Sequence, residues 1–274
     1  MQSSKYSVTF ACYNQVDYTR KCIESMTRHG DDLSRLVVID NGSTDHTRDY
    51  LQTLPLGDLI LNHSNLGCGV AWNQGILALQ TEWTIIMNND VIVSPNWIEN
   101  LIYTAEDNNL KIISPALIEG PLDYDFDTFA TNSSHKMGNH LRFGNSHAVC
   151  LAVHESVWHD IGFFQPIPKL LGYEDAIFFG EATKAKIPMG MTGKSWLHHY
   201  GSITQSAMKQ ERGIANNKDL DHPGITTNYK KGWLQRKLTK LKRKHQQSQW
   251  RKHELNQFGI SMHGERTSNS FIWK

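Results

Sequence analysis

Short apolar runs alternate with segments of helical periodicity over residues 6–90, and this alternation restricts the fold more than any other feature of the chain. The runs are rich in β-branched and aromatic residues and predict strands at 6–12, 36–40, 59–62 and 83–90. The segments between them predict helices at 17–28, 43–54 and 70–80. Strands that alternate with helices favour an α/β fold, with a mostly parallel central sheet and helices on both faces.

Polar residues follow every one of these strands. In open α/β sheets, ligands bind outside the carboxyl ends of the strands. We therefore expect a ligand site along that edge of the sheet.

A less regular second half follows. We expect a helix near 95–108, a strand at 112–118, and a polar loop at 123–140 that acts as an acceptor-side insertion or lid. Strand and helix signals then return at 145–153, 154–162 and 172–186, and a last strand runs into 196–202.

Composition excludes several classes of protein. The 28 Lys and Arg against 27 Asp and Glu give a net charge of +1, so overall charge does not favour nucleic-acid binding. Four scattered cysteines without a CxxC pair indicate neither a zinc knuckle nor a disulfide framework. No signal peptide or long apolar run is apparent, so we expect a cytoplasmic protein, at most peripheral at the inner face of the membrane.

Positive charge is concentrated near the end of the chain. Residues 230–252 are dense in Lys and Arg and contain no acid, and Leu234, Leu238 and Leu241 recur at helical spacing. This pattern predicts a basic amphipathic helix. It is consistent with contact to an anionic membrane or a polyanion, and equally with a solvated helix packed on the domain or a homodimer contact.

The string VVIDNGSTD (37–45) ends a strand in Asp40. A carboxylate there can accept a hydrogen bond from a nucleoside base or a ribose hydroxyl. The alternative is that the residues after it only cap a helix.

The string NLGCGVAWNQGI (65–76) places Gly67 and Gly69 before a helix. Glycines allow the backbone to approach a ligand, and a helix start offers unpaired N–H groups to a pyrophosphate. An ordinary turn would look similar. The string is not a GxGxxG after the first strand, which counts against a dinucleotide-binding fold.

The string MNNDVIVSPNWIE (87–99) ends a strand in Asn88, Asn89 and Asp90. Asp90 is the natural ligand for a hard divalent cation that neutralises a diphosphate, with Asn88 assisting. An Asx turn is the alternative.

Two further strings carry titratable groups. GYEDAIF (172–178) sets Glu174 and Asp175 at the start of a helix, where one can act as a general base or both can simply favour the helix dipole. WLHHYGS (196–202) offers His198 or His199 to a metal or a diphosphate.

These elements together resemble glycosyltransferase family 2. That family has an opening turn (here CYN, 12–14), DNGSTD, an N-G-x-x-x-N-x-G element, a DXD-like element, an ED pair and a late histidine, and the six occur in this order over about residues 6–204. A sugar nucleotidyltransferase would instead carry a Gly-rich basic loop after the first strand, where this chain has YNQVDYTR.

The resemblance implies a GT-A fold, a UDP-, dTDP- or GDP-sugar donor, Mn²⁺ or Mg²⁺, and inversion at the anomeric carbon. It implies Asp175 as the catalytic base, with Glu174 beside it, and a metal held by Asp90, Asn88 and His198, with His199 as the fallback. It implies donor contacts from Ala11, Tyr13, Asn14, Asp40, Asn65, Gly67, Asn73 and Asn89.

The chain departs from the family pattern at two positions. Asn88 replaces the first acid of the DXD element, a form shared by members resembling rhamnosyltransferases, and Cys12 replaces a threonine in the opening turn. The replacement by Asn88 lowers the metal affinity that we expect.

The expected organisation is a catalytic domain at 1–204, divided into a donor half (1–110) and an acceptor half (111–204), followed by a linker and basic extension at 205–274. The expected function is an inverting, metal-dependent transfer of a hexose or deoxyhexose to a hydroxyl of a lipid-linked or polysaccharide glycan. The alternatives are transfer to hydroxymethylated nucleic-acid bases, and a degenerate module that only binds nucleotide-sugars.

Overall fold

The computed structural model describes residues 5–166, 174–201, 203 and 233–274. The expected linker at 205–232 and the first two residues of the GYED string lie outside this part of the chain.

The first half contains the predicted strands and helices. The strands are β1 (Tyr6–Cys12), β2 (Leu36–Asp40), β3 (Asp58–Leu61) and β4 (Trp83–Asn88), and the helices are α1 (Val16–Arg28), α2 (Thr47–Leu51) and α3 (Cys68–Ala78). All pairs among these four strands are parallel, in the order β3-β2-β1-β4. Only α2 is much shorter than predicted.

The second half extends the same sheet with mixed strand directions. Its strands are β5 (Val91–Val93), β6 (Ile112–Glu119), β7 (Leu141–Phe143), β8 (Cys150–His154), β9 (Met189–His199), β10 (His263–Thr267) and β11 (Ser270–Trp273). Its helices are α4 (Trp97–Asp107), α5 (Phe126–Met137), α6 (Glu155–Ile161), α7 (Glu174–Lys184) and α10 (Trp233–Phe258). β8 inserts antiparallel between β4 and β6, while the long β9 pairs with β6, β5 and β7.

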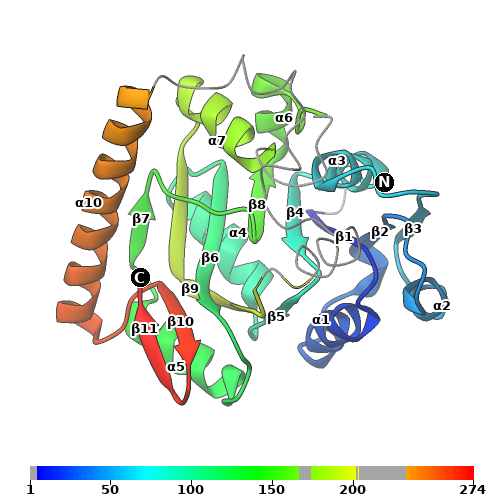
Figure 1. Cartoon of the computed structure of the whole chain (residues 1–274), viewed down its shortest axis with the longest axis horizontal. Coiled ribbons are helices and arrows are strands. Elements are labelled where there is room, and N and C mark those ends of the chain that lie inside the picture. Colours follow the sequence, from blue (N-terminus) through cyan, green and yellow to red (C-terminus); the bar gives the residue numbers. More distant parts are fainter. Residues whose placement is uncertain (1–4, 167–173, 202, 204–232) are drawn as a thin grey trace.

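Helices cover both faces of the curved sheet (Figure 1). The larger core, on one face, includes apolar side chains of α1, α4 and α5, such as Ile23, Leu101 and Phe126. On the other face, Trp72 of α3, Val157 of α6 and Phe178 of α7 form a second core. The two-sided burial explains why β2 and most of β1 and β4 read as continuous apolar runs.

The prediction of a polar loop or lid at 123–140 is wrong. It contains α5, whose side chains Phe126, Ala130 and Met137 are buried in the larger core. Asp125 caps the helix by accepting a hydrogen bond from Thr128 N at 3.0 Å. The polar outer face of α5 concealed its apolar stripe in the sequence.

The C-terminal residues return to the sheet. β10 pairs in parallel with β6, and β11 folds back on β10 in a hairpin. Residues 263–274 therefore belong to the same sheet as the region 1–204, a continuity that the sequence pattern did not indicate.

A buried ion pair attaches α10 to this sheet. Arg142 of β7 donates from Nε and Nη2 to the two carboxylate oxygens of Glu254, at 2.7 and 2.6 Å. Glu254 also accepts from Ser261 Oγ and Met262 N. Burial alone would raise the pKa of Glu254, but the hydrogen bonds from Arg142 and His140 outweigh it and lower the pKa to about 2.

No helix in the described part of the chain is both long enough and apolar enough to cross a membrane.

Close packing of α3 on the sheet depends on Gly75. A methyl group at this position would lie 1.8 Å from Thr9 Oγ1 and 2.8 Å from Ile39 Cδ1. We expect Gly75→Ala to lower the free energy of unfolding by about 1 to 3 kcal/mol, measured by urea denaturation, because a tightly packed core must shift. Gly180→Ala in α7 is the matched control: it meets open space and should raise stability by about 0.4 to 1 kcal/mol. Equal effects of the two changes would contradict the proposed contact.

Glu254→Gln tests the anchor of α10. We expect a loss of about 3 to 5 kcal/mol in the free energy of unfolding, because Arg142 stays buried without its partner charge. The pKa of Glu254 in the folded protein lies below its ordinary value of 4.5. The ion pair therefore stabilises the folded state above pH 4.5, and this stabilisation is lost as the pH falls toward about 2. The free energy of unfolding of Glu254→Gln should therefore fall less than that of the parent between pH 4.5 and about 2.

The double variant Arg142→Met with Glu254→Leu is the control, because it removes both charges and should recover much of the loss. If the single variant unfolds like the parent at every pH, the pair does not anchor the helix.

Candidate active site

The ends of three parallel strands meet at one edge of the sheet. Cys12, the last residue of β1, lies in register with Asp40 of β2, and Ala11 lies in register with Asn88 of β4. The DNGSTD and MNND strings therefore flank the end of β1 on its two sides, at the same edge of the parallel sheet.

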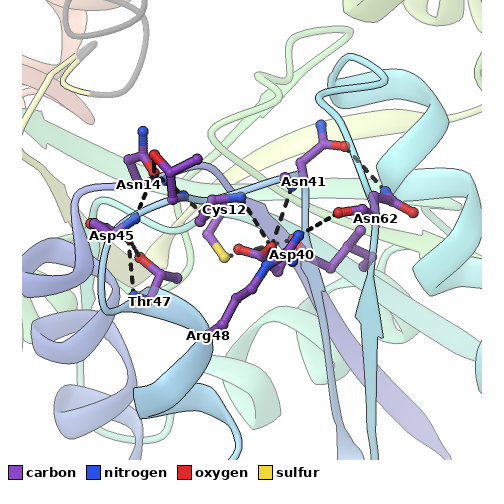
Figure 2. Close-up of polar contacts among 12 residues, drawn as sticks. Cys12, Asn14, Asp40, Asn41, Asp45, Thr47, Arg48 and Asn62 are labelled. Carbon is purple, nitrogen blue, oxygen red and sulfur yellow. Dashed lines mark hydrogen bonds and ion pairs between the residues drawn. The ribbon is translucent and has the colours of Figure 1, made fainter.

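Asp40 is fully buried at this edge (Figure 2). Its Oδ1 accepts from Arg48 Nε at 2.6 Å and from Ser43 N at 3.1 Å. Its Oδ2 has no hydrogen-bond partner among the described residues. A buried acceptor without a partner costs free energy, so this oxygen is suited to a donor from a ligand.

The opening turn adopts a left-handed backbone. Asn14 and Gln15 have φ of 52° and 62°. Asn14 Oδ1 accepts from Thr44 N at 2.8 Å, and Asn14 N donates to Ser43 Oγ at 2.8 Å, which joins this turn to the loop after β2 (Figure 2). Tyr13 precedes Asn14 in the same turn and is half-buried.

Asp45 holds the starts of two helices. Its Oδ1 accepts from Thr47 N, the first residue of α2, at 3.0 Å, and its Oδ2 accepts from Val16 N, the first residue of α1, at 3.2 Å. Both carboxylate oxygens of Asp45 are thus occupied, whereas Asp40 Oδ2 has no partner among the described residues.

Side-chain amides hold the glycine-rich loop against the ends of β2 and β3. Asn41 Nδ2 donates to Asn65 Oδ1 at 3.0 Å, and Asn41 Oδ1 accepts from Asn62 Nδ2 at 3.1 Å. Asn65 Oδ1 also accepts from Gly67 N, which has φ of 87°. The loop that opens α3 is therefore fixed in place beside Asp40.

Asp90 and His199 form a buried pair. His199 Nε2 lies 3.2 Å from Asp90 Oδ1, and Asn88 Nδ2 lies 3.4 Å from the same ring nitrogen. Asp90 also accepts from Ile203 N at its Oδ2. Burial alone would lower the pKa of His199, but Asp90 and Glu119 outweigh it and raise the pKa to about 9.

His198 points to the opposite face of β9, as neighbouring residues of a strand do. Its Nδ1 lies 3.0 Å from Tyr124 Oη, and its ring packs edge-on against Phe126 and Tyr200. Burial lowers its pKa to about 4. The structure therefore brings the fallback His199 to Asp90, and places His198 in the core.

Glu119 was absent from the sequence prediction, although it ends β6 as Asp40 ends β2. Its Oε1 lies 3.9 Å from His199 Nδ1, and its Oε2 lies 3.0 Å from His263 Nε2 and 2.7 Å from Lys274 Nζ. His199 and His263 hold the pKa of Glu119 well below its usual range. The C-terminal hairpin is thus connected through Glu119 to the His199–Asp90 pair.

The ED pair approaches the site from α7. Glu174 is buried, and a methyl group on Gly69 would lie 3.3 Å from its Cβ. Asp175 is partly exposed, with Oδ1 accepting from Ala176 N at 2.7 Å. Burial, together with the charges of Glu174, Asp90 and Asp175, raises the pKa of Cys68, the first residue of α3, to about 12.

Two predicted donor contacts have other partners. Asn73 binds the backbone of Phe164 with both amide atoms, at 2.7 and 3.0 Å. Asn89 is buried and donates to Thr19 Oγ1 at 2.9 Å. Both side chains fix helices around the site.

Within the described ranges, no group of three or more His, Cys, Asp and Glu is arranged to hold a metal ion. The Asp90–His199 pair offers one carboxylate and one imidazole. Mn²⁺ and Mg²⁺ commonly take few protein ligands and complete their shell with water and substrate phosphates, so the pair fits such an ion once the ion replaces the proton that His199 shares with Asp90.

Curated relatives with similar sequences are glycosyltransferases. The putative glycosyltransferase EpsH of Bacillus subtilis is 27% identical over 116 residues, which are 41% of this chain and 34% of EpsH. Glycosyltransferase GlyG of Streptococcus pneumoniae is 26% identical over 115 residues, which are 40% of this chain and 38% of GlyG. The chain thus spans little more than a third of the length of these relatives.

Solved structures share the fold at low sequence identity. GalNAc-T7 with UDP, GalNAc and Mn²⁺ matches with a TM-score of 0.57 and 13% identity, over 71% of this chain and 43% of that one. S. aureus TarS 1–349 with UDP-GlcNAc matches with a TM-score of 0.55 and 14% identity, over 74% of this chain and 61% of that one. The predicted GT-A fold is confirmed.

The family model for glycosyl transferase family 2 matches residues 7–160, which is more than half of the chain and includes the first three motifs of the site. The chain belongs to glycosyl transferase family 2.

Proposed function

We propose that this protein transfers a sugar from a nucleoside-diphosphate sugar to a hydroxyl acceptor, with a divalent cation and with inversion at the anomeric carbon. One observation carries the proposal: the unpartnered oxygen of Asp40 and the Asp90–His199 pair lie at the same sheet edge, and Glu174 of α7 packs against Gly69 at the start of α3.

The nucleoside is recognised by Asp40. Its unpartnered Oδ2 would accept the N–H of a base, which removes the cost of a buried unpaired oxygen. Uracil, thymine and guanine all carry such a group. The UDP and UDP-GlcNAc in the two similar structures favour a UDP-sugar over dTDP- and GDP-sugars.

Asp90 and His199 would hold the cation, with Asn88 beside them. When bound, Mn²⁺ or Mg²⁺ neutralises the negative charge that grows on the diphosphate leaving group. The backbone N–H groups at the start of α3, held by Asn65 and Gly67, would face the same diphosphate.

Asp175 is the proposed base. It takes the proton of the acceptor hydroxyl while the hydroxyl oxygen bonds to the anomeric carbon, and the bond from that carbon to the diphosphate oxygen breaks. Attack opposite the leaving group inverts the configuration. Glu174 is less suited, because it is buried against Gly69.

The acceptor we propose is a growing glycan, lipid-linked or free, in polysaccharide biosynthesis by a cytoplasmic enzyme. The NND form of the metal element, with Asn88 in its first position, resembles rhamnosyltransferase-like members and favours a hexose or deoxyhexose. Transfer to hydroxymethylated nucleic-acid bases would be the outcome if the basic segment 230–252 bound DNA. A degenerate binding module is disfavoured by Glu174 and Asp175 of the GYED string, because binding of a nucleotide-sugar alone does not need a general base.

Asp90→Ala should abolish metal-dependent donor binding, because it removes the only carboxylate paired with His199 Nε2 in the described part of the chain. Calorimetric titration with UDP-, dTDP- and GDP-sugars, with and without Mn²⁺, measures the effect. We expect the parent to bind one donor at least about tenfold more tightly with Mn²⁺, a difference of about 1.4 kcal/mol.

His199→Gln and His198→Gln distinguish the two histidines. The first should lose the Mn²⁺ dependence and the second should retain it, provided that thermal melting shows both variants folded. If the donor affinity of the Asp90→Ala variant still increased with Mn²⁺, the proposed metal site would be refuted.

Asp175→Asn should slow the release of nucleoside diphosphate by at least about 100-fold, because an amide cannot accept the proton. A coupled assay with water as the attacking hydroxyl measures this rate without a known acceptor. Calorimetry should show donor affinity within about twofold of the parent, a difference of about 0.4 kcal/mol. Glu174→Gln is the comparison; if it alone stopped turnover, the base would be Glu174.

A further inference from the structure

The amino-terminal part of α10 has a cationic surface that also exposes two leucines. Every side chain that the structure describes between residues 237 and 246 is exposed. Five of these ten residues are Lys or Arg, and none is acidic. Leu238 and Leu241 are 58% and 55% exposed within this cationic stretch, where solvation alone gives no reason for leucine.

The two leucines face away from the protein. At about 100° per residue, they lie about 60° apart on the helix and about 140° to 160° from Glu254. Glu254 is fully buried and marks the side on which α10 packs, together with the partly buried Trp250 and Phe258. In Figure 1, α10 lies at one end of the molecule, with its inner side toward β7.

Cations border the leucines on both sides. Lys242 lies about 40° around the helix from Leu238, and Lys244 lies about 60° from Leu241 on the other side. An apolar stripe between lysines is the arrangement of a helix that lies in the plane of a membrane, with leucines in the acyl boundary and ammonium groups among anionic headgroups.

The leucines decide between possible partners. A nucleic acid would be bound through its phosphates and would leave the leucines exposed to water. A second copy of this chain would bring five more cations against these five, which is unfavourable. A surface with anionic headgroups above an apolar layer offers partners both to the Lys and Arg side chains and to the two leucines.

We propose that the outer face of α10, defined by Leu238, Leu241, Lys242 and Lys244, docks the protein on an anionic phospholipid surface. This docking is independent of the proposed sugar transfer, because no side chain of α10 that the structure describes contacts the Asp90–His199 pair.

Vesicle sedimentation of the whole chain tests the docking. We expect binding to vesicles of phosphatidylcholine and phosphatidylglycerol in equal parts, weakened by salt, and little binding to phosphatidylcholine alone. Leu238→Ser with Leu241→Ser should weaken binding at least about tenfold. Lys242→Gln with Lys244→Gln should weaken it about 25-fold, since each charge near the surface contributes roughly a factor of five.

Leu77→Ser is the matched control. Leu77 is a 51% exposed leucine on α3, at the other end of the molecule in Figure 1, and its loss should leave vesicle binding unchanged. The buried Glu254 anchor is intact in all these variants, and thermal melting should confirm that they fold like the parent.

Three results would overturn the proposal. The folded parent could fail to bind anionic vesicles at low salt. The leucine variant could bind vesicles as the parent does while the lysine variant does not, with duplex DNA competing; the surface would then bind any polyanion. A dimer in analytical ultracentrifugation that the leucine variant dissociates, without vesicle binding, would make a second copy the occupant.

Discussion

Parallel pairing of β2, β1 and β4 is the constraint on which the rest of the structure depends. It brings Asp40, Cys12 and Asn88 to one edge, because parallel strands all end on the same side. Each strand end then passes into a loop whose polar groups need partners. Asn14 and Asn41 supply them, so that the loops after β1, β2 and β3 hold one another in place. These hydrogen bonds form within the protein itself, and Asp40 Oδ2 is left as an acceptor without a partner among the described residues.

Electrostatics connects this edge to the other half of the sheet. His199 and Glu119 come from β9 and β6, which pair in parallel, so their ends also lie together. Glu119 lies between His199 and two partners from the C-terminal hairpin, His263 and Lys274. Asp90 and Glu119 together raise the pKa of His199 against the effect of burial, while His199, His263 and Lys274 lower the pKa of Glu119, so His199 and Glu119 stabilise each other's charged form. The last residues of the chain thereby contribute to the environment of Asp90.

Sequence reasoning located the four parallel strands of the first half, together with Asp40 and Asp90 at their ends, since periodicity and strand-end position are local properties. It could not decide between His198 and His199. A bulge in β9, where Thr192 pairs with Pro115 and Trp196 with Ala116, breaks the alternation from which a side chain's face is counted. Glu119 was missed because its partners lie about 80 to 150 residues further along the chain. The helix α5 was missed because its solvent-facing residues outnumber its buried ones.

For α10 too, local sequence predicts the helix, whereas distant contacts set its orientation. The composition of residues 230–252 predicted a basic helix, yet composition does not say which side of a helix faces the protein. That direction is set by Glu254, which accepts two hydrogen bonds from Arg142 and one each from Ser261 and Met262. With its inner side fixed by a buried carboxylate, the helix cannot turn about its axis to bury Leu238 and Leu241. The ion pair that holds α10 to the sheet is therefore also the reason that its leucines face solvent.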